Sequence, residues 1–257
     1  MATKVDLDSR YLFAEKADGV LTVRIDRPER RNALTIEMYH GIKKGLVLAE
    51  RDPEIDLVVI TGTGDYFCVG GEMGGKHEGG AALDRETDGL DLTPFVQLER
   101  CPKLVIMRIN GMCQGGGLVM TIMSDISIVS ERAKFRVPEL LRGVADCWLG
   151  GRLAPRVGVA RAKYLLFTAQ YFSAQEALAM GLVSCVVPHD SLDAALEETI
   201  RQVRLTGPAA RRALKRDLNR SLPRIDMEMY SDSLVSEECR EGFQAFVEKR
   251  PPRWPAI

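Results

Sequence analysis

Apolar and polar residues follow two different periods in the N-terminal part of the chain. From Tyr11 to Ile25 they alternate on either side of Asp18-Gly19, a strong turn signal, and this pattern predicts a β-hairpin. Farther along, apolar residues recur at helical spacing behind Thr35, which can cap a helix. The apolar face of this predicted helix, which ends near Asp52-Pro53, is formed by Leu34, Met38, Ile42, Leu46 and Ala49.

Two mostly apolar runs, Leu57 to Thr61 and Leu104 to Ile109, predict strands that are covered on both faces. The segment from Lys76 to Leu92 lies between them and is polar, glycine-rich and aperiodic. We expect it to form either a mobile flap over a site or a variable surface loop. A short helix is predicted from about Thr93 to Glu99.

The rest of the chain first alternates between short strands and helices and then becomes wholly helical. Further strands are predicted at Ile126 to Val129, Ala133 to Phe135 and Leu182 to Val187. Further helices are predicted over Leu149 to Phe167, after Ser173, and from Ser191 onward. This order predicts an α/β core, residues 1–190, followed by a helical C-terminal region, residues 191–257.

Charge and cysteine usage exclude several classes of protein. The 35 basic and 36 acidic residues nearly cancel, so bulk charge favours neither nucleic acid nor a membrane surface as a partner. The six cysteines form no CxxC pair, and the three histidines are far apart, so we expect no metal site and a reducing cytoplasmic location. One basic cluster has helical spacing and is interpreted as a solvated helix face rather than an RNA site: Arg211, Arg212, Lys215, Arg216 and Arg220.

A glycine-rich stretch from Asn110 to Asp125 links the predicted strand Leu104 to Ile109 to an apolar segment, Leu118 to Met123. Three successive glycines are costly unless the backbone must do something that side chains would prevent. A helix N-terminus with bare N–H groups favours negative charge on a ligand or a transition state. The stretch therefore predicts a backbone donor site at the start of a short buried helix.

Five short motifs along the chain resemble those of the crotonase (enoyl-CoA hydratase/isomerase) superfamily, in the same order and over nearly the whole length. One departure is Glu72, where the family usually has aspartate. The five are Arg27-Pro28 with Asn32-Ala33-Leu34, Phe67 to Glu72, Asn110-Gly111 with Gly115-Gly116-Gly117, Ala133-Lys134-Phe135 with Pro138-Glu139, and Glu241-Gly242 with Ala245-Phe246.

This resemblance implies a spiral of ββα units whose C-terminal helices build a homotrimer, often doubled to a hexamer. It also implies a coenzyme A thioester as substrate, with no separate cofactor. By the resemblance, the loop of Asn32, Ala33 and Leu34 binds the coenzyme A chiefly through backbone groups. An ordinary helix entry would explain this loop equally well without the other motifs.

The resemblance further implies that the backbone N–H groups of Gly71 and Gly116 form an oxyanion hole for the thioester oxygen. Two such donors lower the barrier to an enolate, and losing one typically costs on the order of 3–4 kcal/mol. The alternative is that the glycines serve only tight packing.

Glu139 matches one of two glutamates that hold a water molecule in hydratases of the family. The second falls at the position of Val119, which can neither hold water nor move a proton. A single glutamate resembles the enoyl-CoA isomerases, where one carboxylate carries a proton between two carbons. We therefore expect isomerisation rather than hydration, although Glu139 could also be a first-turn helix residue after Pro138.

Asp146 is a second candidate catalytic carboxylate. It matches an aspartate of dienoyl-CoA isomerases when counted back from Arg152-Leu153, but falls one residue short when counted forward from Glu139. It could instead cap the helix that begins near Leu149. The alternatives to isomerisation are a hydratase that uses Glu139 with Asp146, or an acyl-CoA-binding trimer without catalysis.

Overall fold

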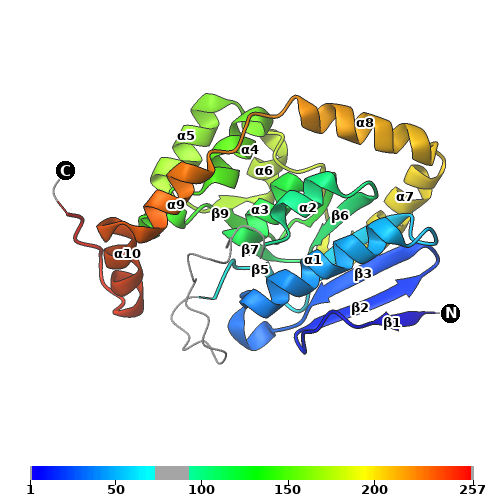
Figure 1. Ribbon diagram of the computed structural model, residues 1–257, viewed down its shortest axis with the longest axis horizontal. Helices are drawn as coiled ribbons and strands as arrows, with labels where there is room; N and C mark the ends of the chain where they lie inside the picture. Colours follow the sequence, from blue (N-terminus) through cyan, green and yellow to red (C-terminus); the bar gives the residue numbers. More distant parts are fainter. Residues whose placement is uncertain (1, 73–92, 256–257) are drawn as a thin grey trace.

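The computed structural model describes residues 2–72 and 93–255, whose strands form two sheets (Figure 1). The larger sheet has the order β1 (Thr3–Val5), β2 (Leu12–Ala17), β3 (Val20–Ile25), β4 (Leu57–Gly62), β6 (Leu104–Ile109), β8 (Ile126–Ser130), β11 (Cys185–Val187). The first three strands are antiparallel and the others continue in parallel from β3. The smaller sheet has the order β10 (Phe172–Ser173), β9 (Lys134–Arg136), β7 (Met112–Gln114), β5 (Tyr66–Cys68).

Successive segments repeat one pattern, with a strand in the large sheet, a strand in the small sheet and then a helix. The repeats are β4 and β5 with α2 (Phe95–Arg100), β6 and β7 with α3 (Gly116–Met123), and β8 and β9 with the 3-10 turn η2 (Glu139–Arg142). The predicted α/β spiral of ββα units is confirmed. Strands β5 and β7 pair in parallel, so the loops that follow them lie next to each other.

The N-terminal predictions agree closely with the structure. The hairpin β2–β3 turns at Asp18 and Gly19, both of which have positive φ. Helix α1 (Ile36–Arg51) begins at Thr35, whose Oγ1 accepts a hydrogen bond from the Met38 N–H at 3.2 Å. Each residue of β4 is buried, as expected for a strand covered on both faces. The predicted flap, Lys76 to Leu92, lies outside the described residues.

The middle of the chain differs from the prediction in one helix and several short strands. The single helix predicted over Leu149 to Phe167 is two helices, α4 (Cys147–Val157) and α5 (Val159–Thr168). Gly158 separates them with φ 78° and ψ 153°, which no helix accommodates. Strands β5, β7 and β10 were not predicted because two or three residues carry no readable alternation. Ser173 caps α6 (Ala174–Ala179) as predicted.

The C-terminal region is helical, as predicted, and consists of α7 (Leu192–Arg204), α8 (Pro208–Arg220), α9 (Met227–Val235) and α10 (Glu237–Val247). The interpretation of the basic cluster on α8 as a solvated face is wrong for Lys215. Its ammonium group is buried, donates to Asp125 Oδ2 at 2.7 Å and to two backbone carbonyls. Arg211 likewise pairs with Asp56, so these two residues tie α8 to the core.

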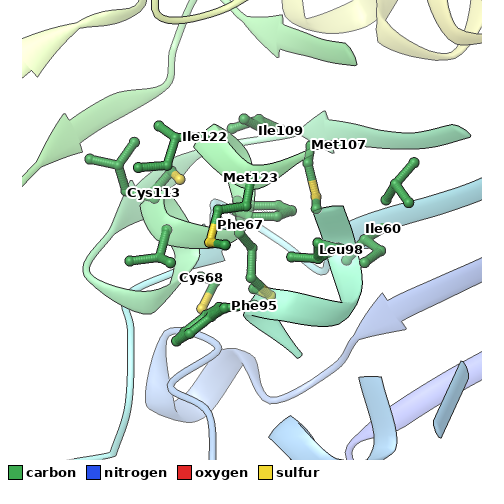
Figure 2. Packing of buried hydrophobic residues seen from close by; sticks show 14 of the residues in the cluster. Ile60, Phe67, Cys68, Phe95, Leu98, Met107, Ile109, Cys113, Ile122 and Met123 are labelled. Atoms are coloured by element: carbon green, nitrogen blue, oxygen red, sulfur yellow. The ribbon is translucent and has the colours of Figure 1, made fainter. Parts of the chain in front are cut away.

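The large core lies between the sheets and the helices that cover them. Figure 2 shows part of it, where Phe67 of β5, Leu98 of α2 and Met123 of α3 meet. Helix α3 is buried almost throughout, so its position is fixed by packing on both flanks. Among residues 2–72 and 93–255, no helix is both long enough and apolar enough to cross a membrane.

Candidate active site

The first component of the site is the N-terminus of α3, which follows directly from β7. Gly115 stands at the helix start with φ 56° and ψ −132°, a conformation that residues with a side chain rarely adopt. Its unusual backbone turns the chain sharply from strand to helix. The N–H of Gly116 belongs to the first helical turn, which has no intrahelical acceptor. The predicted short buried helix is therefore present with the glycine stretch at its start, and its role as a donor site stays a prediction.

The second component is the loop after β5, which is held by a short bridge to Leu34. The Leu34 N–H donates to the Gly70 carbonyl at 2.9 Å, and the Glu72 N–H donates to the Leu34 carbonyl at 2.8 Å. In a parallel bridge of this kind, the residue between the two bonded positions directs its own N–H to the opposite side. The Gly71 N–H therefore points away from Leu34, as a donor to a ligand would have to.

The two glycine loops approach each other so closely that side chains between them are excluded. A Cβ built at Gly70 would lie 3.2 Å from the Gly116 nitrogen. A Cβ built at Gly117 would lie 2.5 Å from the Cys68 carbonyl oxygen, well inside van der Waals contact. The structure thus brings the loops of Gly71 and Gly116 into one small region, and the joint donation of their N–H groups to one oxygen stays a prediction.

Glu139 lies beside this region at the start of η2. A Cβ built at Gly115 would lie 3.2 Å from Glu139 Oε1, which places the carboxyl group against the glycine stretch. Glu139 Oε2 is buried and has no hydrogen-bond partner among the described residues. A buried polar atom without a partner is costly, and a catalytic role is one of the reasons for which a protein retains one. This position is the one expected of a general base, since the Glu139 carboxyl group lies beside the predicted oxyanion hole.

Asp146 caps α4, and its charge raises the pKa of Glu139. Its Oδ1 accepts a hydrogen bond from the Leu149 N–H at 2.7 Å, so the predicted helix cap is present. Burial raises the pKa of Asp146, while its backbone hydrogen bonds oppose that shift. Burial, followed by the nearby charge of Asp146, raises the pKa of Glu139 to about 8. Glu139 is therefore a stronger base than an exposed glutamate.

The C-terminal helices hold the loop that carries these two carboxyl groups. Ser233 Oγ of α9 accepts from the Ala145 N–H at 3.0 Å. The Arg142 guanidinium lies over the Phe246 ring of α10, with 4.0 Å to the ring centroid. The helical region thus contributes directly to the position of Glu139 and Asp146.

Three aromatic rings pack in series near the two carboxyl groups. Phe95, Trp148 and Tyr230 pack edge to face, with ring centroids 4.8 and 4.9 Å apart. Burial raises the pKa of Tyr230, and the charges of Asp146 and Glu139 add to this effect. Tyr230 was not singled out in the sequence because it lies on α9, far along the chain from both carboxylates. Its surroundings place it in the wall of the same site.

Asn32, Ala33 and Leu34 connect the loops of the site to each other. The buried Asn32 side chain accepts from the Arg27 N–H and donates to the carbonyl oxygens of Thr63 and Tyr66. Both backbone groups of Leu34 bind the loop of Gly71, as described above. The three residues therefore position the donor loop, and their contact with coenzyme A stays a prediction.

The cysteines next to the donor loops are not candidate nucleophiles. Cys68 and Cys113 are buried, and burial raises the pKa of both thiols, that of Cys68 to about 12. A thiol that is not ionised is a poor nucleophile. Both cysteines are therefore small buried residues of the core.

Ionisation of Glu139 should make the folded protein less stable as pH rises. Its raised pKa means that the folded state holds a proton that the unfolded state has released. The associated stability is complete below the unfolded pKa and is lost as pH rises through the folded pKa. We expect the free energy of unfolding to fall by a few kcal/mol, as an order of magnitude, between about pH 5 and pH 9.

Denaturant titrations of the wild type and Glu139→Gln across this range test the expectation. The variant should show a shallower decline, whereas replacing the exposed Glu131 with glutamine should leave the slope unchanged. Equal slopes in the wild type and Glu139→Gln would show that Glu139 ionises normally.

Comparisons with known proteins agree with this fold and site. The family model for enoyl-CoA hydratase/isomerase matches residues 15–256. Crotonyl-CoA hydratase of Syntrophomonas wolfei is 31% identical over 249 residues, covering 93% of this chain and 95% of the relative. Short-chain-enoyl-CoA hydratase of Clostridium acetobutylicum is 31% identical over 253 residues, covering 95% and 97%. The crystal structure of carnitinyl-CoA hydratase from Mycobacterium avium has a TM-score of 0.84 at 29% identity, covering 97% and 100%.

The paired sheets, the two glycine loops and the buried glutamate define a crotonase-superfamily acyl-CoA enzyme. The chain belongs to the enoyl-CoA hydratase/isomerase family. The relatives carry hydratase names, so the predicted preference for isomerisation does not follow from them.

Proposed function

We propose that this enzyme converts a 3-enoyl-CoA thioester into the 2-enoyl-CoA isomer, with Glu139 as the proton carrier. The observation that carries the proposal is the buried Glu139 carboxyl, unpartnered at Oε2 among the described residues and lying against Gly115. A base that must take up and return one proton needs such an environment, because water would otherwise exchange with it.

The reaction proceeds through a dienolate. Glu139 removes a proton from carbon two of a 3-enoyl-CoA, and the electron pair moves onto the thioester oxygen. The N–H groups of Gly71 and Gly116 stabilise this negative oxygen. The protonated Glu139 then donates its proton to carbon four, which gives the 2-enoyl-CoA and restores the carboxylate.

Asp146 supports the base without taking the proton itself. Its negative charge raises the pKa of Glu139, so the carboxylate removes a carbon-bound proton more readily. Its hydrogen bond to the Leu149 N–H holds it at the start of α4.

Val119 is the residue that favours isomerisation over hydration. It is fully buried in α3, one helical turn beyond Gly115, to whose carbonyl it donates at 2.9 Å. A valine at this position can neither hold a water molecule nor accept a proton. Hydration by Glu139 with Asp146 is the second candidate, because these carboxyl groups interact electrically and the relatives carry hydratase names.

A direct test supplies 2-enoyl-CoA and 3-enoyl-CoA thioesters separately and follows hydration and double-bond migration. The proposal predicts migration at an enzymatic rate with little hydration. Rapid hydration of 2-enoyl-CoA that requires both Glu139 and Asp146 would support the second candidate. Binding of both thioesters without turnover of either would identify an acyl-CoA-binding protein.

Val119→Glu should create measurable hydratase activity. The new carboxyl group would stand one helical turn from Gly115, where it could hold a water molecule with Glu139. Val119→Gln is the matched control, since it has similar size and polarity but cannot act as a base. Product analysis by mass spectrometry checks the gain, and equal hydration by the two variants would contradict the argument from the missing carboxylate.

We also propose that the chain forms a homotrimer or a hexamer through its C-terminal region. Large apolar side chains on the described helices of this region are exposed, and such surface favours association. They include Leu214, Leu218, Val235, Phe246 and Val247.

A further inference from the structure

The Tyr39 hydroxyl lies between the two loops that carry the donor glycines. A Cβ built at Gly116 would lie 2.2 Å from Tyr39 Oη, and a Cβ built at Gly71 would lie 3.5 Å from the same atom. The hydroxyl therefore occupies space directly beside both glycines. An oxygen that accepts from the Gly71 and Gly116 N–H groups is within reach of this third polar group.

Local structure fixes the tyrosine in this place. Tyr39 lies in the first turn of α1, where its N–H donates to the Thr35 carbonyl at 3.0 Å. Its ring packs edge to face on Phe95, with centroids 5.7 Å apart and planes at 78°. Phe95 in turn packs on Trp148, so the phenol is part of the aromatic series that lines the site.

The phenol can only act as a neutral donor. Burial raises the pKa of Tyr39 well above its ordinary value, and the nearby carboxyl groups add to this shift. The O–H is therefore intact at every pH at which Glu139 ionises, so it can donate to a developing negative charge.

We propose that Tyr39 is a catalytic residue that donates its O–H to the thioester oxygen as a third member of the oxyanion hole. This inference rests on the proposed function, because it assigns Tyr39 to the same enolate. The phenol donor adds to two backbone donors that the glycine loops hold rigidly. Its contribution should be largest for a reaction whose intermediate carries a full negative charge on oxygen.

Tyr39→Phe tests the proposal, with Tyr171→Phe, an exposed tyrosine on the surface, as the control. We expect Tyr39→Phe to lower kcat/KM by roughly ten- to a hundredfold, mainly through kcat. Tyr171→Phe should leave kcat/KM unchanged. An unchanged kcat/KM in a folded Tyr39→Phe would overturn the proposal.

Binding of acetoacetyl-CoA gives a readout that does not depend on turnover. The enolate of this thioester absorbs in the near ultraviolet, so its bound fraction can be titrated against pH. Tyr39→Phe should shift the enolate titration to higher pH by about one unit or more, which corresponds to a tenfold or greater loss of enolate stabilisation. An unshifted titration would contradict a donor role.

A double-mutant cycle with Gly116→Ala tests the geometry independently. In the wild type, the added methyl group meets the Tyr39 hydroxyl at 2.2 Å; without the hydroxyl, its nearest neighbour is the ring carbon at 3.3 Å. Gly116→Ala should therefore lower the melting temperature less in the Tyr39→Phe background. Equal losses in both backgrounds would show that the hydroxyl lies elsewhere.

These measurements separate the inference from the proposed function. Loss of acetoacetyl-CoA enolate in Tyr39→Phe, from a wild type that turns over neither enoyl-CoA, would support Tyr39 as a donor and refute the isomerase. Full isomerase activity in the wild type and in Tyr39→Phe would support the isomerase and refute Tyr39 as a donor.

Discussion

Replacing Glu139 with glutamine is expected to lower kcat/KM for double-bond migration by about 10³-fold, within the range for loss of a general base. The effect is large because the Glu139 carboxyl lies against Gly115 and its raised pKa makes it a stronger base than an exposed glutamate. Glutamine keeps the size of the side chain but cannot accept the carbon-bound proton. Steady-state assays with 3-enoyl-CoA measure the change.

Asp146→Asn tests whether the charge of Asp146 acts on the base. It keeps an oxygen to cap α4, but it removes the charge that raises the pKa of Glu139. We expect a smaller loss, and we expect the pH at which kcat/KM reaches half its maximum to move downward. Substantial activity in Glu139→Gln, or equal losses in the two variants, would show that the base has been assigned wrongly.

Gly115→Ala should remove most activity and also weaken the fold. The residue holds φ 56° and ψ −132°, where a side chain costs about 1–3 kcal/mol. The new methyl group would also stand 3.2 Å from Glu139 Oε1 and 3.3 Å from the Gly70 Cα. We expect relief of either contact to rotate the Gly116 N–H away from the proposed oxyanion position. We expect kcat/KM to fall by about 10²–10³-fold.

Gly150→Ala is the matched control for this substitution. Gly150 lies inside α4 at an exposed position, and the atom nearest to a built Cβ is the Met229 Cε at 4.0 Å. This variant should be as active as the wild type and more stable by about 0.5–1 kcal/mol. Kinetics and denaturant titration check both variants. Full activity in Gly115→Ala would contradict the geometry of the donor site.

The features that could be predicted from the sequence are those whose cause is local. The turn at Asp18-Gly19, the cap at Thr35 and the glycine stretch each have a chemical reason within a few residues. The pairing of Glu139 with the glycine stretch came from the order of the motifs rather than from any local pattern. The burial of Glu139 depends on side chains from other segments and could not be predicted from the sequence.

The features that could not be predicted depend on contacts between distant segments. In the sequence Lys215 resembles a surface residue of α8, because its partner Asp125 is ninety positions away and only the fold brings the two together. Tyr39 follows the apolar position Met38 and has no motif of its own. Its role becomes visible only when the loops of Gly71 and Gly116 fold around its hydroxyl.

Transfer of a hydrogen label tests the central claim, proton carriage by Glu139, most directly. A 3-enoyl-CoA that carries deuterium at carbon two is converted in ordinary water, and the product is examined at carbon four by mass spectrometry. We predict that a measurable share of the deuterium reappears at carbon four in the wild type, and that Glu139→Gln forms almost no product. Complete loss of the label to water, together with undiminished product formation by Glu139→Gln, would contradict the account.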